Sequence, residues 1–271
     1  MTVRAESDPW TAAAVAVYVS GRYACSGTAV TADRRTFVIT AAGCVPEPSM
    51  PPDGSAPAPS LPASPPPPGT TERPEDAWLG LRPGRDLTAA PAVAAARSVD
   101  MRPEGGATAT RDIGIWQAMG PLPGVVALPL GRAGRGTVVA AVGWGVTTAP
   151  PSSEPTRVGA VPVRVAGAGP CAGARPAVGG ADLCAQATEP GVCLADRGGA
   201  LLADVGGVLS VVGVASRTSG EGCDRAGVYT AVDGEVHRWI AARLAGWTRD
   251  DAGMAEELER DRRAGLVTPS P

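Results

Sequence analysis

The chain has 271 residues, 44% of them hydrophobic and 19% charged, and its net charge of −3 gives no electrostatic case for binding nucleic acid or an anionic membrane. All 24 basic residues are Arg, because the sequence contains no Lys, and this excludes Schiff-base enzymes, Ser-Lys dyads and phosphate-binding P-loops. A single His excludes a multi-histidine metal site. We expect no metal and no cofactor.

Short β-rich runs separated by Gly and Pro make up most of the chain. They are rich in Val and Ile, and few of them exceed eight residues. We expect strands at 12–19, 26–31, 36–41, 77–81, 111–117, 137–143, 158–165, 199–203, 208–215 and 226–232. This spacing favours an all-β sandwich or barrel over a parallel sheet with crossover helices.

The first apolar run, TAAAVAVYV at residues 11–19, also fits the core of a short signal peptide. We interpret it as a strand, because the run is only nine residues long and Glu6 and Asp8 precede it. No good cleavage site follows it. We therefore see no clear signal peptide in this chain.

Segment 46–74 differs sharply from the rest, with twelve prolines and almost no aliphatic residues. This composition predicts an extended, solvated loop with polyproline character that adds nothing to a core. A docking ligand for a proline-reading module is the alternative. We favour an inserted loop.

Two helical segments are expected near the C-terminus. Val236, Trp239, Ile240 and Leu244 recur at helical spacing. They predict an amphipathic helix over 234–246. The charged segment 248–264 predicts a second, solvent-exposed helix, and we expect the last residues of the chain to be disordered.

The cysteines indicate an oxidising compartment. The chain has six of them, widely spaced and without a CxxC pair, which predicts three disulfides outside the cytoplasm. Spacing alone allows fifteen pairings. No apolar stretch approaches the roughly 18 residues of a membrane-spanning helix, so we expect a secreted or extracytoplasmic protein. Heavy use of Ala, Gly, Pro and Arg without Lys or Asn indicates GC-rich coding, hence a high-GC bacterium.

Several motifs occur in one order along the chain. They read Cys25-Ser-Gly-Thr-Ala-Val, Val38-Ile-Thr-Ala-Ala-Gly-Cys44, Arg111-Asp-Ile-Gly-Ile115, Val142-Gly-Trp-Gly145, Gly191-Val-Cys-Leu-Ala-Asp-Arg-Gly-Gly-Ala-Leu201, Val212-Gly-Val-Ala-Ser216 and Gly227-Val-Tyr-Thr230. Together they resemble the landmarks of the chymotrypsin/trypsin family of serine proteases, including its TAAHC and GDSGG motifs. The resemblance covers about residues 3–246.

The resemblance implies two six-stranded antiparallel β-barrels with a C-terminal α-helix and an active site in the cleft between them. The N-terminal barrel would span 1–120, with the Pro-rich loop inserted at 46–74. The C-terminal barrel and its helix would span 121–247, followed by a charged tail at 248–271, partly helical or disordered. The implied disulfides are Cys25–Cys44, Cys171–Cys184 and Cys193–Cys223.

The catalytic positions are degenerate. Acyl transfer in this family needs a Ser nucleophile, a His that accepts its proton and an Asp that orients the His. Asp112 matches the Asp, but Gly43 stands at the His position and Arg197 at the Ser position. Gly has no side chain, and Arg is a permanently protonated donor, so neither replaces the lost group. We therefore expect a pseudoprotease.

No other residue restores the chemistry. The resemblance places His237 on the surface of the terminal helix, far from the cleft. Ser216 matches the Ser that hydrogen-bonds the triad Asp, and Ser26 lies on a strand; neither has a base beside it. We expect all cysteines to be bridged.

Further cleft positions are expected to bind a partner. These candidate binding residues are Gly191, Ala195, Asp196, Ser216 and Thr218. Ala195 replaces the first glycine of the oxyanion-hole segment, and Gly191 stands where trypsin-like members carry an Asp. Asp196 matches the Asp that pairs with a newly cut N-terminal amine, for which Val3 is the candidate. A hydrogen-bonded turn residue is an equally good interpretation of Asp196.

Loss of the His leaves a space beside Asp112, and a buried carboxylate without a partner is unfavourable by several kcal/mol in order of magnitude. We predict that the Arg197 guanidinium occupies this space and pairs with Asp112. The alternative is that Arg197 stays free in the cleft and binds an acidic group on a partner.

We therefore expect a monomeric, secreted protein that binds a protein or peptide in the inter-barrel cleft without proteolysis. One alternative is a serine-type endopeptidase with a non-standard site. The other is a scaffold that recruits partners through its Pro-rich loop and charged tail.

Overall fold

The computed structural model describes residues 9–19, 22–32, 35–45, 79–84, 86–87, 93–101, 111–118, 121–147, 157–188, 193–194, 196–220 and 226–263. The predicted Pro-rich loop at 46–74 and the predicted disorder of the last residues lie outside these ranges.

Six antiparallel strands close a first barrel in the order β1-β2-β3-β6-β5-β4. They are β1 (Ala14–Val19), β2 (Arg22–Ala32), β3 (Arg35–Thr40), β4 (Leu79–Pro83), β5 (Val93–Asp100) and β6 (Gly114–Ala118). In β1 and in the second half of β3, successive residues are buried, so both faces of these strands are covered. In β3, Val38 packs in a cluster with other first-barrel residues, whereas its neighbours Phe37 and Ile39 face a cluster shared with the second barrel.

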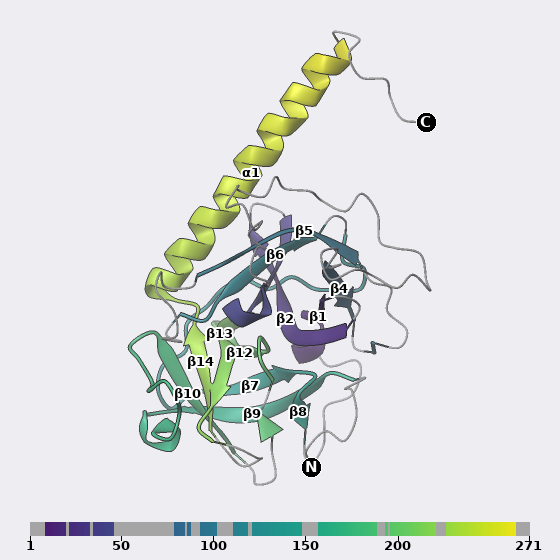
Figure 1. Cartoon of the computed structure of the whole chain (residues 1–271). Helices are drawn as coiled ribbons and strands as arrows, with labels where there is room; N and C mark the ends of the chain where they lie inside the picture. The colour runs from purple at the N-terminus through teal and green to yellow at the C-terminus, as the bar shows by residue number, and fades with distance from the viewer. Residues whose placement is uncertain are drawn as a thin grey trace, which may run out of the picture.

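A second barrel closes in the order β10-β14-β13-β12-β7-β9. Its strands are β7 (Val138–Gly143), β9 (Gly159–Ala166), β10 (Asp182–Ala187), β12 (Ala200–Val205), β13 (Val208–Thr218) and β14 (Gly227–Ala231). Two short strands, β8 (Val146–Thr147) and β11 (Cys193–Leu194), pair separately. The prediction of two six-stranded antiparallel barrels is confirmed, and Figure 1 shows the two stacked on each other.

Each predicted run overlaps a strand of these barrels, and the first run forms β1. The strand prediction missed β5 and β10, because their Ala and Asp residues have low β-propensity. These two strands form through pairing with β4 and β6, and with β9 and β14, as each barrel closes. Three 3₁₀ turns complete the described chain: η1 (Pro9–Thr11), η2 (Ala42–Cys44) and η3 (Gly169–Cys171).

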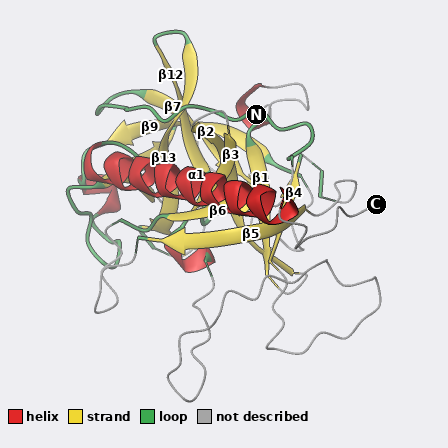
Figure 2. Ribbon diagram, turned by 90° about the horizontal axis from the view of Figure 1, so that it is seen from above, coloured by secondary structure: helices red, strands yellow, loops and turns green. Residues whose placement is uncertain are grey.

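The helix α1 (Gly234–Arg263) joins the two barrels. It begins directly after the second barrel, and its buried Val236, Ile240 and Leu244 pack in the cluster between the barrels. Farther along, the ring of Trp247 lies 6.0 Å from that of Phe37 in β3. Figure 2 shows α1 lying across the strands of the molecule.

The prediction of a separate second helix at 248–264 was wrong, because α1 continues without a break to Arg263. No Pro occurs between Gly234 and Arg263 to end the helix, and an interior Gly weakens a helix by only about 1 kcal/mol. Among the described residues, no helix is apolar enough over a sufficient length to cross a membrane.

Two of the three predicted disulfides are present, Cys25–Cys44 and Cys171–Cys184. The first ties β2 to η2, next to Gly43. The third predicted pair involves Cys223, which lies outside the described residues. Two disulfides suggest an extracellular or secreted protein.

Candidate functional site

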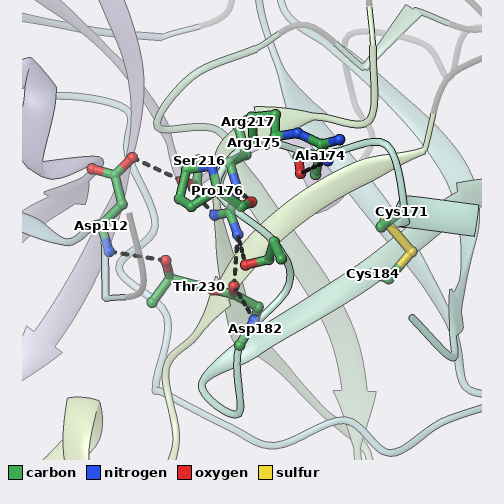
Figure 3. Close-up of polar contacts among 12 residues, drawn as sticks. Asp112, Cys171, Ala174, Arg175, Pro176, Asp182, Cys184, Ser216, Arg217 and Thr230 are labelled. Atoms are coloured by element: carbon green, nitrogen blue, oxygen red, sulfur yellow. Dashed lines mark hydrogen bonds and ion pairs between the residues drawn. A yellow bond between two sulfur atoms is a disulfide. The ribbon is translucent and has the colours of Figure 1, made fainter. Parts of the chain in front are cut away.

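Asp112 lies directly before β6, at the face of the first barrel that meets the second. Its side chain is 5% exposed. The carboxylate accepts hydrogen bonds from the Ser216 hydroxyl (2.9 Å) and from the Gly43 backbone N–H (3.3 Å). Its own backbone N–H donates to Thr230 Oγ1 at 3.1 Å (Figure 3). Asp112 is therefore held from both barrels, as the resemblance implied for Ser216.

Arg197 supplies the cationic partner of this carboxylate. Its Nη2 donates to Asp112 Oδ2 at 3.2 Å, which confirms the predicted pair. The Arg197 side chain is nevertheless 52% exposed. The ion pair therefore joins a buried acid to a cation that still faces solvent.

The guanidinium also lies directly against Gly43. A Cβ placed on Gly43 would lie 2.6 Å from Arg197 Cζ and 2.8 Å from Nη1. The three atoms nearest to this Cβ all belong to the end of the flexible Arg197 side chain, and the Gly43 backbone does not adopt a left-handed conformation. Arg197 thus fills the volume that a side chain at position 43 would enter, as the sequence predicted.

We expect Arg197→Gln to lower the free energy of unfolding by about 1–3 kcal/mol, because it removes a charged donor from a buried carboxylate. The partial exposure of Arg197 keeps this effect below that of a fully buried pair. The measurement is urea unfolding of the wild type, Arg197→Gln, Asp112→Asn and the double variant. A coupling free energy near zero in this cycle would contradict the pairing.

Asp196 forms a second buried contact between the barrels. Its Oδ1 accepts hydrogen bonds from the hydroxyls of Ser26 (2.6 Å) and Tyr23 (3.4 Å), both on β2. The Trp144 backbone N–H donates to the same Ser26 hydroxyl at 3.1 Å. The hydrogen-bonded interpretation of Asp196 is therefore confirmed, whereas the alternative partner, Val3, lies outside the described residues.

Burial raises the pKa of the Asp196 carboxyl to about 7, although the hydrogen bonds from Ser26, the Gly145 backbone and Tyr23 act in the opposite direction. Burial also raises the pKa of Tyr23 far above its usual value. The Tyr23 hydroxyl consequently remains a neutral hydrogen-bond donor.

Two β-bulges, one in β2 and one in β13, determine the faces on which Tyr23, Ser26 and Ser216 lie. The pairing of β1 with β2 jumps from Cys25 to Tyr23 between consecutive β1 residues, so Ala24 is an extra residue. This insertion brings Tyr23 and Ser26 to one face of β2, which simple alternation would not. A similar irregularity in β13 makes Ser216 the extra residue opposite β14. The sequence reasoning missed the role of Tyr23 because a bulge leaves no periodic signal.

Arg217, next to Ser216, is fully engaged in the second barrel. Its guanidinium donates to Asp182 (2.8 Å) and to the carbonyl oxygens of Pro176 (2.9 Å) and Ala177 (3.2 Å), as Figure 3 shows for Asp182. The two charged side chains are only 10% and 0% exposed. Arg217 therefore anchors the loop before β10, a role that no motif in the sequence indicated.

A pocket of about 240 Å³ opens beside Arg197. Its lining consists of Leu194, Asp196, Arg197, Ala215, Ser216, Arg217 and Thr218. Three of the candidate binding residues, Asp196, Ser216 and Thr218, are thus brought together. The other two, Gly191 and Ala195, lie outside the described residues.

The one His of the chain is not part of this arrangement. His237 is exposed on α1, as predicted, and Ser26 is committed to Asp196. In the described part of the chain, the site thus holds an orienting carboxylate, a cation and hydroxyls, without an imidazole.

Comparisons with known proteins agree with this architecture. A family model described as Trypsin matches residues 95–240, which is more than half of the chain. Among solved structures, neuropsin, a serine protease expressed in the limbic system of mouse brain, is similar with a TM-score of 0.63 and 18% identity, over 88% of this chain and 97% of that chain. At this identity the likeness shows the fold. No curated protein matches the sequence.

Proposed function

The chain belongs to the trypsin family, and we propose that it is a secreted member without proteolytic activity that binds a protein or peptide partner in the cleft between its barrels. One observation carries this proposal: the Arg197 guanidinium lies over Gly43 and bonds to Asp112. The positions of the base and the nucleophile are therefore occupied by a single cation.

The chemistry of these side chains argues against acyl transfer. A nucleophilic Ser works because an imidazole accepts its proton and returns it to the leaving group. A guanidinium remains protonated, so it neither accepts that proton nor attacks a carbonyl. Asp112 retains its hydrogen bonds to Ser216 and Gly43 but has no imidazole to orient.

Features that support partner binding remain in place. The pocket beside Arg197 is open, and the rigid strand β13 supplies Ala215, Ser216 and Thr218 to its wall. The disulfide Cys25–Cys44 fixes the turn that carries Gly43. A preorganised pocket on a stapled scaffold suits recognition, because little conformational freedom is lost on binding.

The enzymatic alternative can be tested directly. We expect a fluorophosphonate probe to leave the wild-type chain unlabelled at a concentration that labels an active trypsin-family protease to completion. The physical reason is that the hydroxyls of Ser216 and Ser26 donate to the carboxylates of Asp112 and Asp196, and neither hydroxyl has an imidazole beside it to activate it. Labelling measured by in-gel fluorescence, and abolished by prior denaturation, would establish a serine-type endopeptidase instead.

The scaffold alternative requires its own test. Pull-down with the full chain and with a variant lacking 46–74 separates the two modes of recruitment. We expect the variant to capture the same partners through its cleft. Loss of capture on deletion would favour the scaffold.

A further inference from the structure

We propose that the pocket beside Arg197 binds the carboxylate of an acidic side chain on the polypeptide partner. The inference rests on the proposed function and names the chemistry that the partner presents. It follows from the different use of two arginines in one pocket, from the burial of the neighbouring acids and from the size of the pocket.

The Arg197 guanidinium has more hydrogen-bond donors than its contact with Asp112 uses. A guanidinium carries five N–H groups, and only Nη2 of Arg197 donates to Asp112, through one bond of 3.2 Å. Its other guanidinium N–H groups have no partner among the described residues. Since the side chain is 52% exposed, these donors can reach a ligand in the pocket.

Arg217 provides the internal comparison. Lying in the same pocket wall, it donates to Asp182, to two backbone carbonyl oxygens and to the Ser216 hydroxyl. Its side chain is only 10% exposed, so its guanidinium is paired inside the second barrel. Arg197 is therefore the cation of this wall that remains available.

Apart from the single bond between Arg197 Nη2 and Asp112, the acids around the pocket leave the Arg197 donors to a ligand. Asp112 and Asp182 are 5% and 0% exposed, and each already accepts several hydrogen bonds. Asp196 is buried beneath the pocket, bonded to Ser26, and its raised pKa reduces its negative charge near neutral pH. In the described lining, the exposed ionised group is thus Arg197.

The size of the pocket selects the kind of ligand. A volume of about 240 Å³ lies below the roughly 300–1,000 Å³ of small-molecule sites, so one side chain fits better than a whole metabolite. Leu194 and Ala215 provide an apolar wall for the methylene groups of the ligand side chain. Arg197 can donate hydrogen bonds to the carboxylate at the end of that side chain.

The test uses a library of hexapeptides that are acetylated at the N-terminus and amidated at the C-terminus, so that side chains carry the only carboxylates. The immobilised full chain selects from it, and bound peptides are sequenced. We expect enrichment of Asp or Glu at one position, and about tenfold weaker binding when that residue is replaced by Gln or Asn. Arg197→Gln should lose the enrichment.

Three further variants separate this role from a structural one. Asp112→Asn should bind the selected acidic peptide several-fold more tightly, because it frees Nη2 and removes a competing charge. Asp112→Asn/Arg197→Gln leaves no unpaired buried carboxylate, so it should fold and still lack the preference. Arg132→Gln, which changes an 82% exposed arginine paired with Asp233, should keep it.

The outcomes are distinguishable. Capture of peptides without acidic enrichment by the wild type would overturn the carboxylate proposal and leave the proposed function standing. Failure of the wild type to capture any peptide would remove the proposed function and this inference together. Enrichment seen only in a parallel library with free C-termini would assign the pocket to a chain end, which overturns the side-chain proposal.

Discussion

Replacing Gly43 by His and Arg197 by Ser together is expected to produce a protein that a fluorophosphonate probe labels, whereas either single variant stays unlabelled. A His at position 43 enters the space that the guanidinium leaves, next to Asp112. The Ser then gains a base, and the base gains its orienting carboxylate. Because the triad acts as a unit, we expect the double variant to hydrolyse a peptide ester about a thousandfold faster than either single variant.

The control is the same double variant with Asp112→Asn added. Its rate of ester hydrolysis should be lower by several orders of magnitude, because the imidazole is held in the wrong tautomer. Thermal unfolding verifies that each variant is folded. If the folded double variant remains inert, Ala195→Gly is added to restore the glycine of the oxyanion-hole segment. Inertness of that triple variant would show that the two replaced side chains do not account for the missing proteolysis.

The architecture could be predicted from sequence because its signals are local and ordered. Short Val-rich runs and Gly turns indicated strands, and the order of the motifs indicated two barrels. Strands β5 and β10 left no such signal, since their pairing partners, not their own residues, determine their conformation. The length of α1 beyond Leu244 was missed because charge alone did not distinguish one long helix from two.

The site was predictable only where two changes explain each other. Gly43 has lost a side chain, and Arg197 places a long cation beside the buried Asp112. Pairing of Arg197 with Asp112 accounts for both changes. The contacts of Asp196 with Tyr23 and of Arg217 with Asp182 were not predictable in this way. They join residues far apart in sequence, and bulges in β2 and β13 set which face each side chain takes.

Asp196→Asn is expected to stabilise the protein at neutral and alkaline pH and to leave its stability nearly unchanged at pH 4. The Asp196 carboxyl is fully buried, and its Oδ2 accepts no hydrogen bond from the described residues. Burial therefore raises its pKa from 3.8 in the unfolded chain to about 7 in the folded protein. The Asn variant keeps an oxygen for Ser26 without the charge.

The direction of the pH dependence follows from where the proton is bound. Below pH 3.8 the carboxyl is protonated in both states, and its stabilising contribution is fully present. Between pH 3.8 and about 7 the folded protein retains a proton that the unfolded chain has lost, so the contribution falls by about 1.4 kcal/mol per pH unit.

Above that range the loss is complete, and the Asn variant should be more stable than the wild type by about 4 kcal/mol. Urea unfolding of both proteins at pH 4, 5.5, 7 and 8.5 measures the difference, in which the other titrating groups cancel. Asp204→Asn, at an exposed position near the end of β12, is the control for the loss of a carboxylate from the surface. A difference that did not grow with pH would mean that Asp196 is ionised in the folded protein at low pH, and that Ser26 and Tyr23 stabilise its charge more than burial opposes it.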